Sequence, residues 1–283
     1  MTLTSADWLA AHLDDPDLRV VDARWTLGKP GAGREAYDAG HIPGAIFVDM
    51  DLDLAAPVGP GRHPLPDPGV LASRLGALGI GSEHRIVVYD DTGWVAARFW
   101  WMLDDLGHAE VSVLDGGYPA WTAGGHPIEV EMGSGRAWPA ATLALAPAWT
   151  KVVDRDGLRD QLGEVVLLDA RGGPRYRGEV EPIDPVAGHI PTAVNAPTDQ
   201  NLGPSGTFLT ATDLRSRYQT LGAGADTPVV VSCGSGVSAC HDALAMRVAG
   251  LADPILYPGS WSDWSTAGYP VAIGPEPGEA PAR

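Results

Sequence analysis

Short apolar runs alternate along the chain with longer segments in which apolar residues recur at helical spacing. Arg85–Tyr89 and Val229–Ser232 have the length and composition of strands that are buried on both faces. The segments that follow them, Val95–Leu106 and Ser238–Ala249, have apolar residues at helical spacing. The next short apolar runs are Val111–Leu114 and Ile255–Tyr257. This alternation of strand, helix and strand predicts α/β domains, each an open, mainly parallel sheet flanked by helices.

The same pattern occurs twice. Asp22-Ala23-Arg24 is followed by a Gly-His-Ile-Pro turn at residues 40–43, and Asp169-Ala170-Arg171 is followed by the same turn at residues 188–191. We therefore predict two tandem domains. Their predicted boundaries are 1–130 for the first domain, 131–150 for a Gly/Ala/Pro-rich linker, 151–275 for the second domain and 276–283 for a tail. Each copy has a histidine in this turn, His41 in the first and His189 in the second. Because both copies have it, we interpret these histidines as structural.

Charge and cysteine content narrow the possible functions. The formal net charge is −17, which argues against binding to nucleic acid or to anionic membrane surfaces. Two cysteines cannot build a disulfide framework or a Cys-rich zinc site, and we expect no metal and no cofactor. The N-terminal stretch has neither the basic nor the apolar region of a signal peptide, so we predict a cytoplasmic protein.

The candidate chemistry lies at Cys233, directly after the second buried strand. The residues that follow it are Gly234, Ser235, Gly236, Val237 and Ser238, and then a helix begins. Such a loop points backbone N–H groups inward and forms an anion-sized cradle at the carboxyl end of a parallel strand. The cradle and the helix favour the thiolate form of the cysteine, which is the nucleophile in covalent catalysis. The alternative is that a free cysteine is a buried structural residue, and this is our interpretation of Cys240.

Two other interpretations of this loop remain. Gly234-x-Gly236-x-x-Ala239 fits the dinucleotide-binding pattern, but it falls late in its domain and only Asp253 could serve as the ribose-binding acid. A cysteine phosphatase would need an arginine where the chain has Ala239. In the first copy Asp90 takes the position of the cysteine, so we expect that domain to be catalytically silent.

These repeated motifs, with a Cys loop in the second copy alone, resemble those of the two-domain rhodanese-type sulfurtransferases, from about Ser5 to about Ile273. Within that family, Cys-Gly-Ser-Gly-Val-Ser-Ala is similar to the loop of 3-mercaptopyruvate sulfurtransferases. The resemblance implies that Cys233 attacks the donor's sulfur and becomes a persulfide. It also implies a proton relay of Ser235, His63 and Asp51, and a grip on the substrate carboxylate by Arg175.

The chain departs from that pattern at Ile183, where these enzymes usually have a second carboxylate-binding arginine. Because this second arginine is missing, the identity of the sulfur donor stays open. The leading hypothesis is transfer from 3-mercaptopyruvate, a small anionic donor, to cyanide or to a thiol acceptor of the thioredoxin-like or low-molecular-weight kind. Since residues 234–238 carry no cation, a donor less charged than thiosulfate is favoured. The alternatives are a thiosulfate sulfurtransferase using the same cysteine, and a non-catalytic persulfide relay or binding module.

Overall fold

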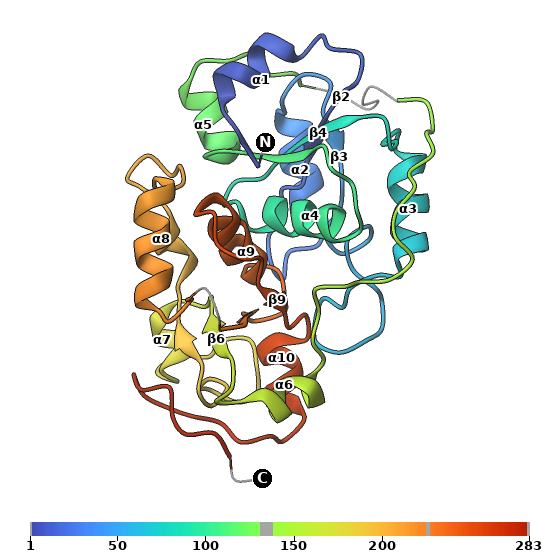
Figure 1. Ribbon diagram of the computed structural model, residues 1–283. Coiled ribbons are helices and arrows are strands. Elements are labelled where there is room, and N and C mark those ends of the chain that lie inside the picture. Colours follow the sequence, from blue (N-terminus) through green and yellow to red (C-terminus); the bar gives the residue numbers. More distant parts are fainter. Residues whose placement is uncertain (1, 131–137, 225–226, 282–283) are drawn as a thin grey trace. The chain divides into compact units, whose positions relative to one another are not determined.

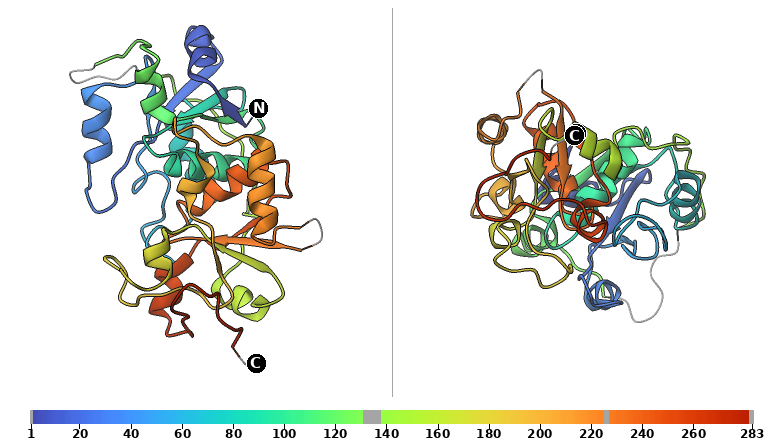
Figure 2. Two further views of the ribbon diagram at one scale, coloured as in Figure 1. Left: turned by 90° about the vertical axis from the view of Figure 1, so that its left-hand side faces the viewer. Right: turned by 90° about the horizontal axis from the view of Figure 1, so that it is seen from below.

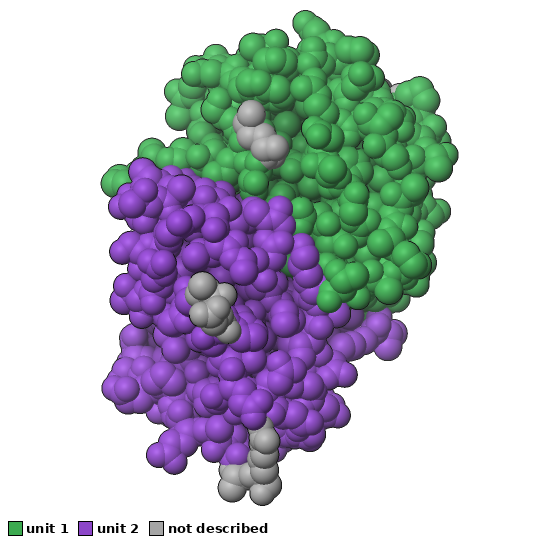
Figure 3. All heavy atoms as spheres, in the orientation of Figure 1, with its two compact units in different colours: residues 1–57, 65–150, 204–207 green, residues 58–64, 151–203, 208–283 purple. Residues whose placement is uncertain are grey.

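The computed structural model describes residues 2–130, 138–224 and 227–281. Two compact units divide the chain (Figure 3). Unit 1 consists of residues 1–57, 65–150 and 204–207, and unit 2 of residues 58–64, 151–203 and 208–283. The predicted boundaries are contiguous, whereas each unit takes one short segment from the other half of the chain. Residues 131–137 of the predicted linker and 282–283 of the predicted tail lie outside the described residues.

Unit 1 is built on a parallel sheet with the strand order β1-β5-β4-β2-β3 (Figure 1). Its strands are β1 (Leu3–Thr4), β2 (Leu18–Asp22), β3 (Ile46–Phe47), β4 (Arg85–Tyr89) and β5 (Val111–Leu114). Its helices are α1 (Ala6–His12), α2 (Ala32–Ala39), α3 (Pro68–Ala77), α4 (Trp94–Asp105) and α5 (Gly117–Ala123).

Unit 2 repeats this plan with the parallel order β7-β6-β8-β9. Its helices and strands are seen from two further directions in Figure 2. Its strands are β6 (Val166–Asp169), β7 (Val194–Asn195), β8 (Val229–Ser232) and β9 (Ile255–Leu256). Its helices are α6 (Arg155–Gln161), α7 (Gly173–Tyr176), η1 (Thr198–Asn201), α8 (Ala211–Thr220), α9 (Ala239–Val248) and α10 (Ser260–Thr266). The predicted α/β fold with two parallel sheets and flanking helices is confirmed. Across the described ranges, none of the helices has the length and apolar character needed to cross a membrane.

Several helices begin where the sequence supplies a side-chain cap. Ser5, Asp67, Asp154 and Thr210 each accept a hydrogen bond from a backbone N–H in the first turn of the helix that follows. These first-turn N–H groups have no partner within the helix, so a capping oxygen typically stabilises the helix by about 1 kcal/mol. The caps thus define the starts of α1, α3, α6 and α8.

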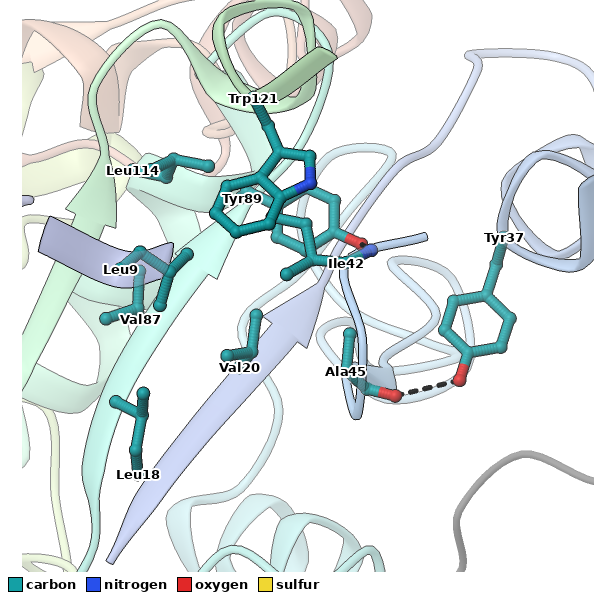
Figure 4. Packing of buried hydrophobic residues seen from close by; sticks show 10 residues of the cluster. All are labelled: Leu9, Leu18, Val20, Tyr37, Ile42, Ala45, Val87, Tyr89, Leu114 and Trp121. Atoms are coloured by element: carbon teal, nitrogen blue, oxygen red, sulfur yellow. Dashed lines mark hydrogen bonds between the residues drawn. The ribbon is translucent and has the colours of Figure 1, made fainter. Parts of the chain in front are cut away.

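The two units have cores of the same construction. In unit 1, apolar residues of the central strands pack against Trp121 and Leu9, which are fully buried (Figure 4). The hydroxyl of Tyr37 donates to the carbonyl of Ala45 at 2.8 Å (Figure 4), and Tyr176 makes the corresponding bond in unit 2. Burying a large apolar side chain contributes about 1.5–3 kcal/mol, so the repeated apolar pattern stabilises both cores in the same way.

The repeated Asp-Ala-Arg motif ties the end of a central strand to the Gly-His turn. The Arg24 guanidinium donates to both carboxylate oxygens of Asp22 and, at 2.7 Å, to the carbonyl of Gly40. Arg171 makes the same bonds in unit 2, where it reaches the carbonyl of Gly188 at 2.7 Å. These charges are buried in pairs, which limits the cost of their desolvation.

The turn histidines complete this arrangement. His41 stacks on Tyr37 and His189 stacks on Tyr176, each with ring centroids 3.8 Å apart. The Nδ1 atom of each histidine also lies 2.8 Å from the carbonyl of the tyrosine on which it stacks. Both rings are buried, and the contacts agree with the structural role that we expect for them.

Candidate active site

The Cys233 loop joins β8 to α9, as the sequence predicts, and Cys233 is only 2% exposed. Gly236 adopts a left-handed conformation with φ of +73°. A methyl group at this glycine would lie 2.5 Å from the carbonyl oxygen of Pro258. The loop therefore requires glycine at 236 both for its backbone angle and for its close approach to the chain beside it.

The start of α10 holds the loop in place. The backbone N–H of Cys233 donates to Oγ of Ser260 at 3.0 Å, and that Oγ lies 4.0 Å from Sγ of Cys233. The N–H groups of Trp261 and Ser262 donate to the carbonyls of Cys233 and Gly234, each at 2.9 Å. Together these bonds fix the backbone on both sides of the sulfur.

Ser260 was not singled out from the sequence, although the repeat contains a signal for it. It has φ of +52°, a conformation that costs a side chain about 1–2 kcal/mol. Its counterpart in unit 1 is Gly117, which has φ of +59°. A serine in place of the unstrained glycine positions a hydroxyl against Cys233, and strain retained at such a place indicates a functional requirement.

The matching loop of unit 1 shows how the backbone of this turn binds a carboxylate. Asp90 is buried, and its carboxylate accepts hydrogen bonds from the backbone N–H groups of Thr92, Gly93, Val95 and Ala96. Burial nevertheless raises the pKa of Asp90 to about 6. Gly93, like Gly236, is left-handed. A turn of this kind thus directs several N–H donors at one acidic group. The corresponding cradle around Cys233 stays a prediction.

His63 and Ser235 are brought together although 172 residues separate them in the chain. Nδ1 of His63 lies 2.8 Å from Oγ of Ser235, and both side chains are buried. Residues 58–64 belong to unit 2, so this contact lies within one unit. Asp51 belongs to unit 1, where it accepts a hydrogen bond from Nε1 of Trp25 at 2.9 Å. The role of Asp51 in a relay with His63 stays a prediction.

Two guanidinium groups approach the loop, although residues 234–238 contain no cation. A methyl group at Gly234 would lie 3.0 Å from Nη2 of Arg62 and 3.5 Å from Nη1 of Arg175. Burial works to lower the pKa of Arg171, but the charges of Asp169, Glu181 and Cys233 together raise it above its usual value. Arg175 is predicted from the sequence as a site residue, whereas Arg62 and Arg171 are not. The lack of a cation in the loop therefore does not describe the charge of the site.

Two buried carboxylates hold the arginines. Arg175 donates to Glu181 at 2.7 Å and to Asp184 at 3.2 Å. Arg62 forms an ion pair with the other oxygen of Asp184. Burial works to raise the pKa of Glu181, but the bonds from Arg175 and from backbone N–H groups bring it below its usual value. Arg62 and Arg175 are thus bridged by one carboxylate.

The structure also places the other residues that the sequence suggested for this loop or for the alternative functions. Val237 is buried in the loop, and Ser238 accepts a backbone N–H at the start of α9. Cys240 is fully buried in α9, and its Sγ lies 3.5 Å from the carbonyl of Gly236, as a structural cysteine would. Asp253, the candidate ribose-binding acid, is paired with Lys151 and Arg247, which disfavours a dinucleotide site.

Comparison with known proteins gives a consistent result. The family model described as "Rhodanese-like domain" matches residues 5–124 and 154–267. The chain is 46% identical to the "Probable 3-mercaptopyruvate sulfurtransferase" of Pseudomonas aeruginosa, over 96% of this chain and 98% of that protein. It is 41% identical to a protein of Mycobacterium tuberculosis that carries the name "Putative thiosulfate sulfurtransferase", over 93% of this chain and 94% of that one.

Solved structures agree. The 3-mercaptopyruvate sulfurtransferase from Leishmania major superimposes with a TM-score of 0.82 at 31% identity, covering 95% of this chain and 75% of that one. The sequence-based resemblance is confirmed on both counts, since matching domains occur twice and relatives of 46% and 41% identity span almost the whole chain. The chain belongs to the rhodanese family and contains two rhodanese-like domains.

Proposed function

We propose that this protein is a sulfurtransferase that takes sulfur from 3-mercaptopyruvate and carries it as a persulfide on Cys233. The observation that carries the choice of donor is the 2.8 Å contact between His63 and Ser235, which lies two residues after the nucleophile in the sequence. The sulfurtransferase class has further support from the names of the relatives. The donor and the residue roles are our proposal.

In the first half-reaction, the Cys233 thiolate attacks the thiol sulfur of 3-mercaptopyruvate. An S–S bond forms and the C–S bond breaks, and its electron pair stays on the carbon as the enolate of pyruvate. A proton is then added to that carbon, so the thiol proton of the donor ends in the methyl group of pyruvate. The enzyme keeps the persulfide anion, and no external oxidant or reductant is needed.

The proton transfer explains why a histidine–serine pair suits this donor. An enolate is a strongly basic leaving group, so moving a proton to it lowers the barrier. In the tautomer with its proton on Nε2, His63 accepts a hydrogen bond from the hydroxyl of Ser235 at Nδ1. Ser235 can take the thiol proton of the donor while it passes its own hydroxyl proton to Nδ1, and the reverse transfer then returns a proton to the carbon of the enolate. Asp51 would orient the imidazole, as the family resemblance implies. Thiosulfate releases sulfite, a weak base, and needs no such relay.

In the second half-reaction, an acceptor attacks the outer sulfur and restores the Cys233 thiolate. With cyanide the product is thiocyanate. With a thiolate the product is a new persulfide on the acceptor, of the thioredoxin-like or low-molecular-weight kind that we predict. The acceptor used in the cell and the cytoplasmic location stay predictions.

The test is the turnover of the two donors with cyanide as the acceptor, measured as thiocyanate formed. We expect a higher kcat/KM with 3-mercaptopyruvate than with thiosulfate. A wide margin in favour of thiosulfate would instead assign the second candidate, which the relative from Mycobacterium tuberculosis favours by its name. Failure of both donors would leave the non-catalytic persulfide relay.

The histidine gives an internal comparison. His63→Ala should slow turnover with 3-mercaptopyruvate by about 10²-fold or more, the usual contribution of a positioned acid–base group. It should slow turnover with thiosulfate much less. Equal losses with both donors would count against a relay through His63 and Ser235.

A further inference from the structure

We propose that Arg62 is the second substrate-binding cation of this site and, with Arg175, grips the carboxylate of the donor. Arg62 would thereby perform the task of the arginine that this chain lacks at position 183. The inference rests on the proposed function, because a 2-oxo acid thiol supplies the carboxylate to be bound. It concerns binding of the donor, whereas the persulfide chemistry belongs to Cys233.

The first support is the position of both guanidiniums at Gly234. Nη2 of Arg62 and Nη1 of Arg175 lie 3.0 and 3.5 Å from the point that a methyl group on Gly234 would occupy. Gly234 follows the nucleophile directly in the chain. The two arginines thus present N–H groups from unit 2 to the same part of the loop, and any side chain at residue 234 would meet them.

The second support comes from the guanidinium nitrogens of Arg62 and Arg175 that are not used in the ion pairs with Glu181 and Asp184. Arg175 uses Nε and Nη2 for Glu181 and Asp184, and Nη1 is its nitrogen nearest to Gly234. Arg62 uses Nη1 for Asp184, and it is Nη2 that approaches Gly234. In each case the carboxylates hold one side of the guanidinium while another nitrogen faces the loop. Two such nitrogens suit the two oxygens of a carboxylate.

The backbone around Arg62 is fixed by contacts of its own. The N–H of Arg62 donates to Oγ of Ser262 at 3.0 Å. The preceding Gly61 has φ of +76°, and a methyl group there would lie 2.6 Å from the carbonyl of Gly259. Gly61 and Arg62 therefore lie against the start of α10, the same segment that holds the Cys233 loop. A guanidinium anchored in this way loses little further freedom when it binds an anion.

Ile183 explains why a second arginine is needed. Its side chain is 41% exposed and offers no charge, whereas its neighbours Glu181 and Asp184 supply the carboxylates of the site. Asp184 is paired with Arg62 as well as with Arg175. The cation missing from residue 183 is thus replaced by one that the chain brings from residue 62.

The decisive experiment is a rescue. Arg62→Gln should raise KM for 3-mercaptopyruvate by about tenfold to a hundredfold, the value of one charged hydrogen bond, with kcat nearly unchanged, because the lost contact is made equally in the ground and transition states. Adding Ile183→Arg to that variant should restore much of the affinity. Arg177→Gln is the matched control, since Arg177 pairs with the exposed Glu179 and should leave KM unchanged. An unchanged KM in Arg62→Gln, or no recovery in the double variant, would overturn the proposal.

A second variant separates binding from support of the fold. Asp184→Asn breaks the same ion pair as Arg62→Gln but leaves both guanidiniums in place and less neutralised. We expect its KM for 3-mercaptopyruvate, and the inhibition constant of pyruvate, to be equal to or below the wild-type values. If Asp184→Asn raises KM as much as Arg62→Gln does, the ion pair is structural and the proposal fails.

These outcomes are distinct from failure of the proposed function. If Cys233 gains no sulfur from 3-mercaptopyruvate in the wild-type protein, the function itself is wrong. If Cys233 is persulfidated and KM does not respond to Arg62, only the assignment of Arg62 is wrong. Arg62→Lys keeps the charge that Asp184 needs but loses the planar fork, so it should raise KM less than Arg62→Gln and gives a second test should the glutamine variant fail to fold.

Discussion

Replacement of Gly236 by alanine should destabilise the Cys233 loop, because both the backbone conformation at this residue and its close neighbours exclude a side chain. The left-handed backbone at φ of +73° costs a residue with a side chain about 1–2 kcal/mol. The new methyl group would also lie 2.5, 3.0 and 3.1 Å from the carbonyl oxygen, Cα and carbonyl carbon of Pro258, which are all backbone atoms. Overpacking of that kind typically costs about 1–3 kcal/mol. The expected loss is therefore about 2–5 kcal/mol of unfolding free energy.

Gly268→Ala provides the matched control in the same unit. Gly268 has φ of +74°, but a methyl group there would have no neighbour within 4 Å. Its substitution should cost only the backbone term, about 1–2 kcal/mol. Urea unfolding followed by tryptophan fluorescence would measure both variants, and persulfide formation would test the loop. If Gly236→Ala is no more destabilising than Gly268→Ala, or keeps full sulfur transfer, the argument from close packing is wrong.

Two other substitutions test separate parts of unit 2. Burial raises the pKa of Asp242 to about 7, so the folded protein holds this proton more tightly than the unfolded chain, and the associated stability is lost as pH rises from about 4 to 7. Asp242→Asn should flatten that dependence, which is at most about 1.4 kcal/mol per pH unit, and an unchanged slope would refute the assignment. Ser260→Gly should be about 1–2 kcal/mol more stable to urea than Ser260→Ala, because both lose the hydroxyl while glycine relieves the strain at φ of +52°; equal stabilities would contradict this.

The sequence predicts the fold well because the same pattern occurs twice. The buried runs at Arg85–Tyr89 and Val229–Ser232 become the central strands β4 and β8, and the helices that follow them begin within one residue of the predicted position. Each run is flanked by a helical pattern of a different period, so local preference and burial point to the same structure. The Cys233 loop follows directly from these elements, since it is the connection between β8 and α9.

The charged part of the site was harder to predict, because its residues come from distant places in the chain. Arg62 lies in the first half of the sequence, but its partners Asp184 and Ser262 lie 122 and 200 residues away. No periodicity or motif spacing connects such positions. Ser260 was overlooked for a different reason: its value becomes visible only when its left-handed conformation is compared with that of Gly117 in the other unit.

The most direct test of the account is the intact mass of the protein after incubation with 3-mercaptopyruvate and no acceptor. We predict a gain of one sulfur atom in the wild-type protein and in Cys240→Ser, because Cys240 is packed within α9. Cys233→Ser should show no gain, and cyanide should remove the added sulfur from the other two proteins. A wild-type protein that never gains the sulfur, or a gain that persists in Cys233→Ser, would contradict the assignment of Cys233 as the sulfur carrier.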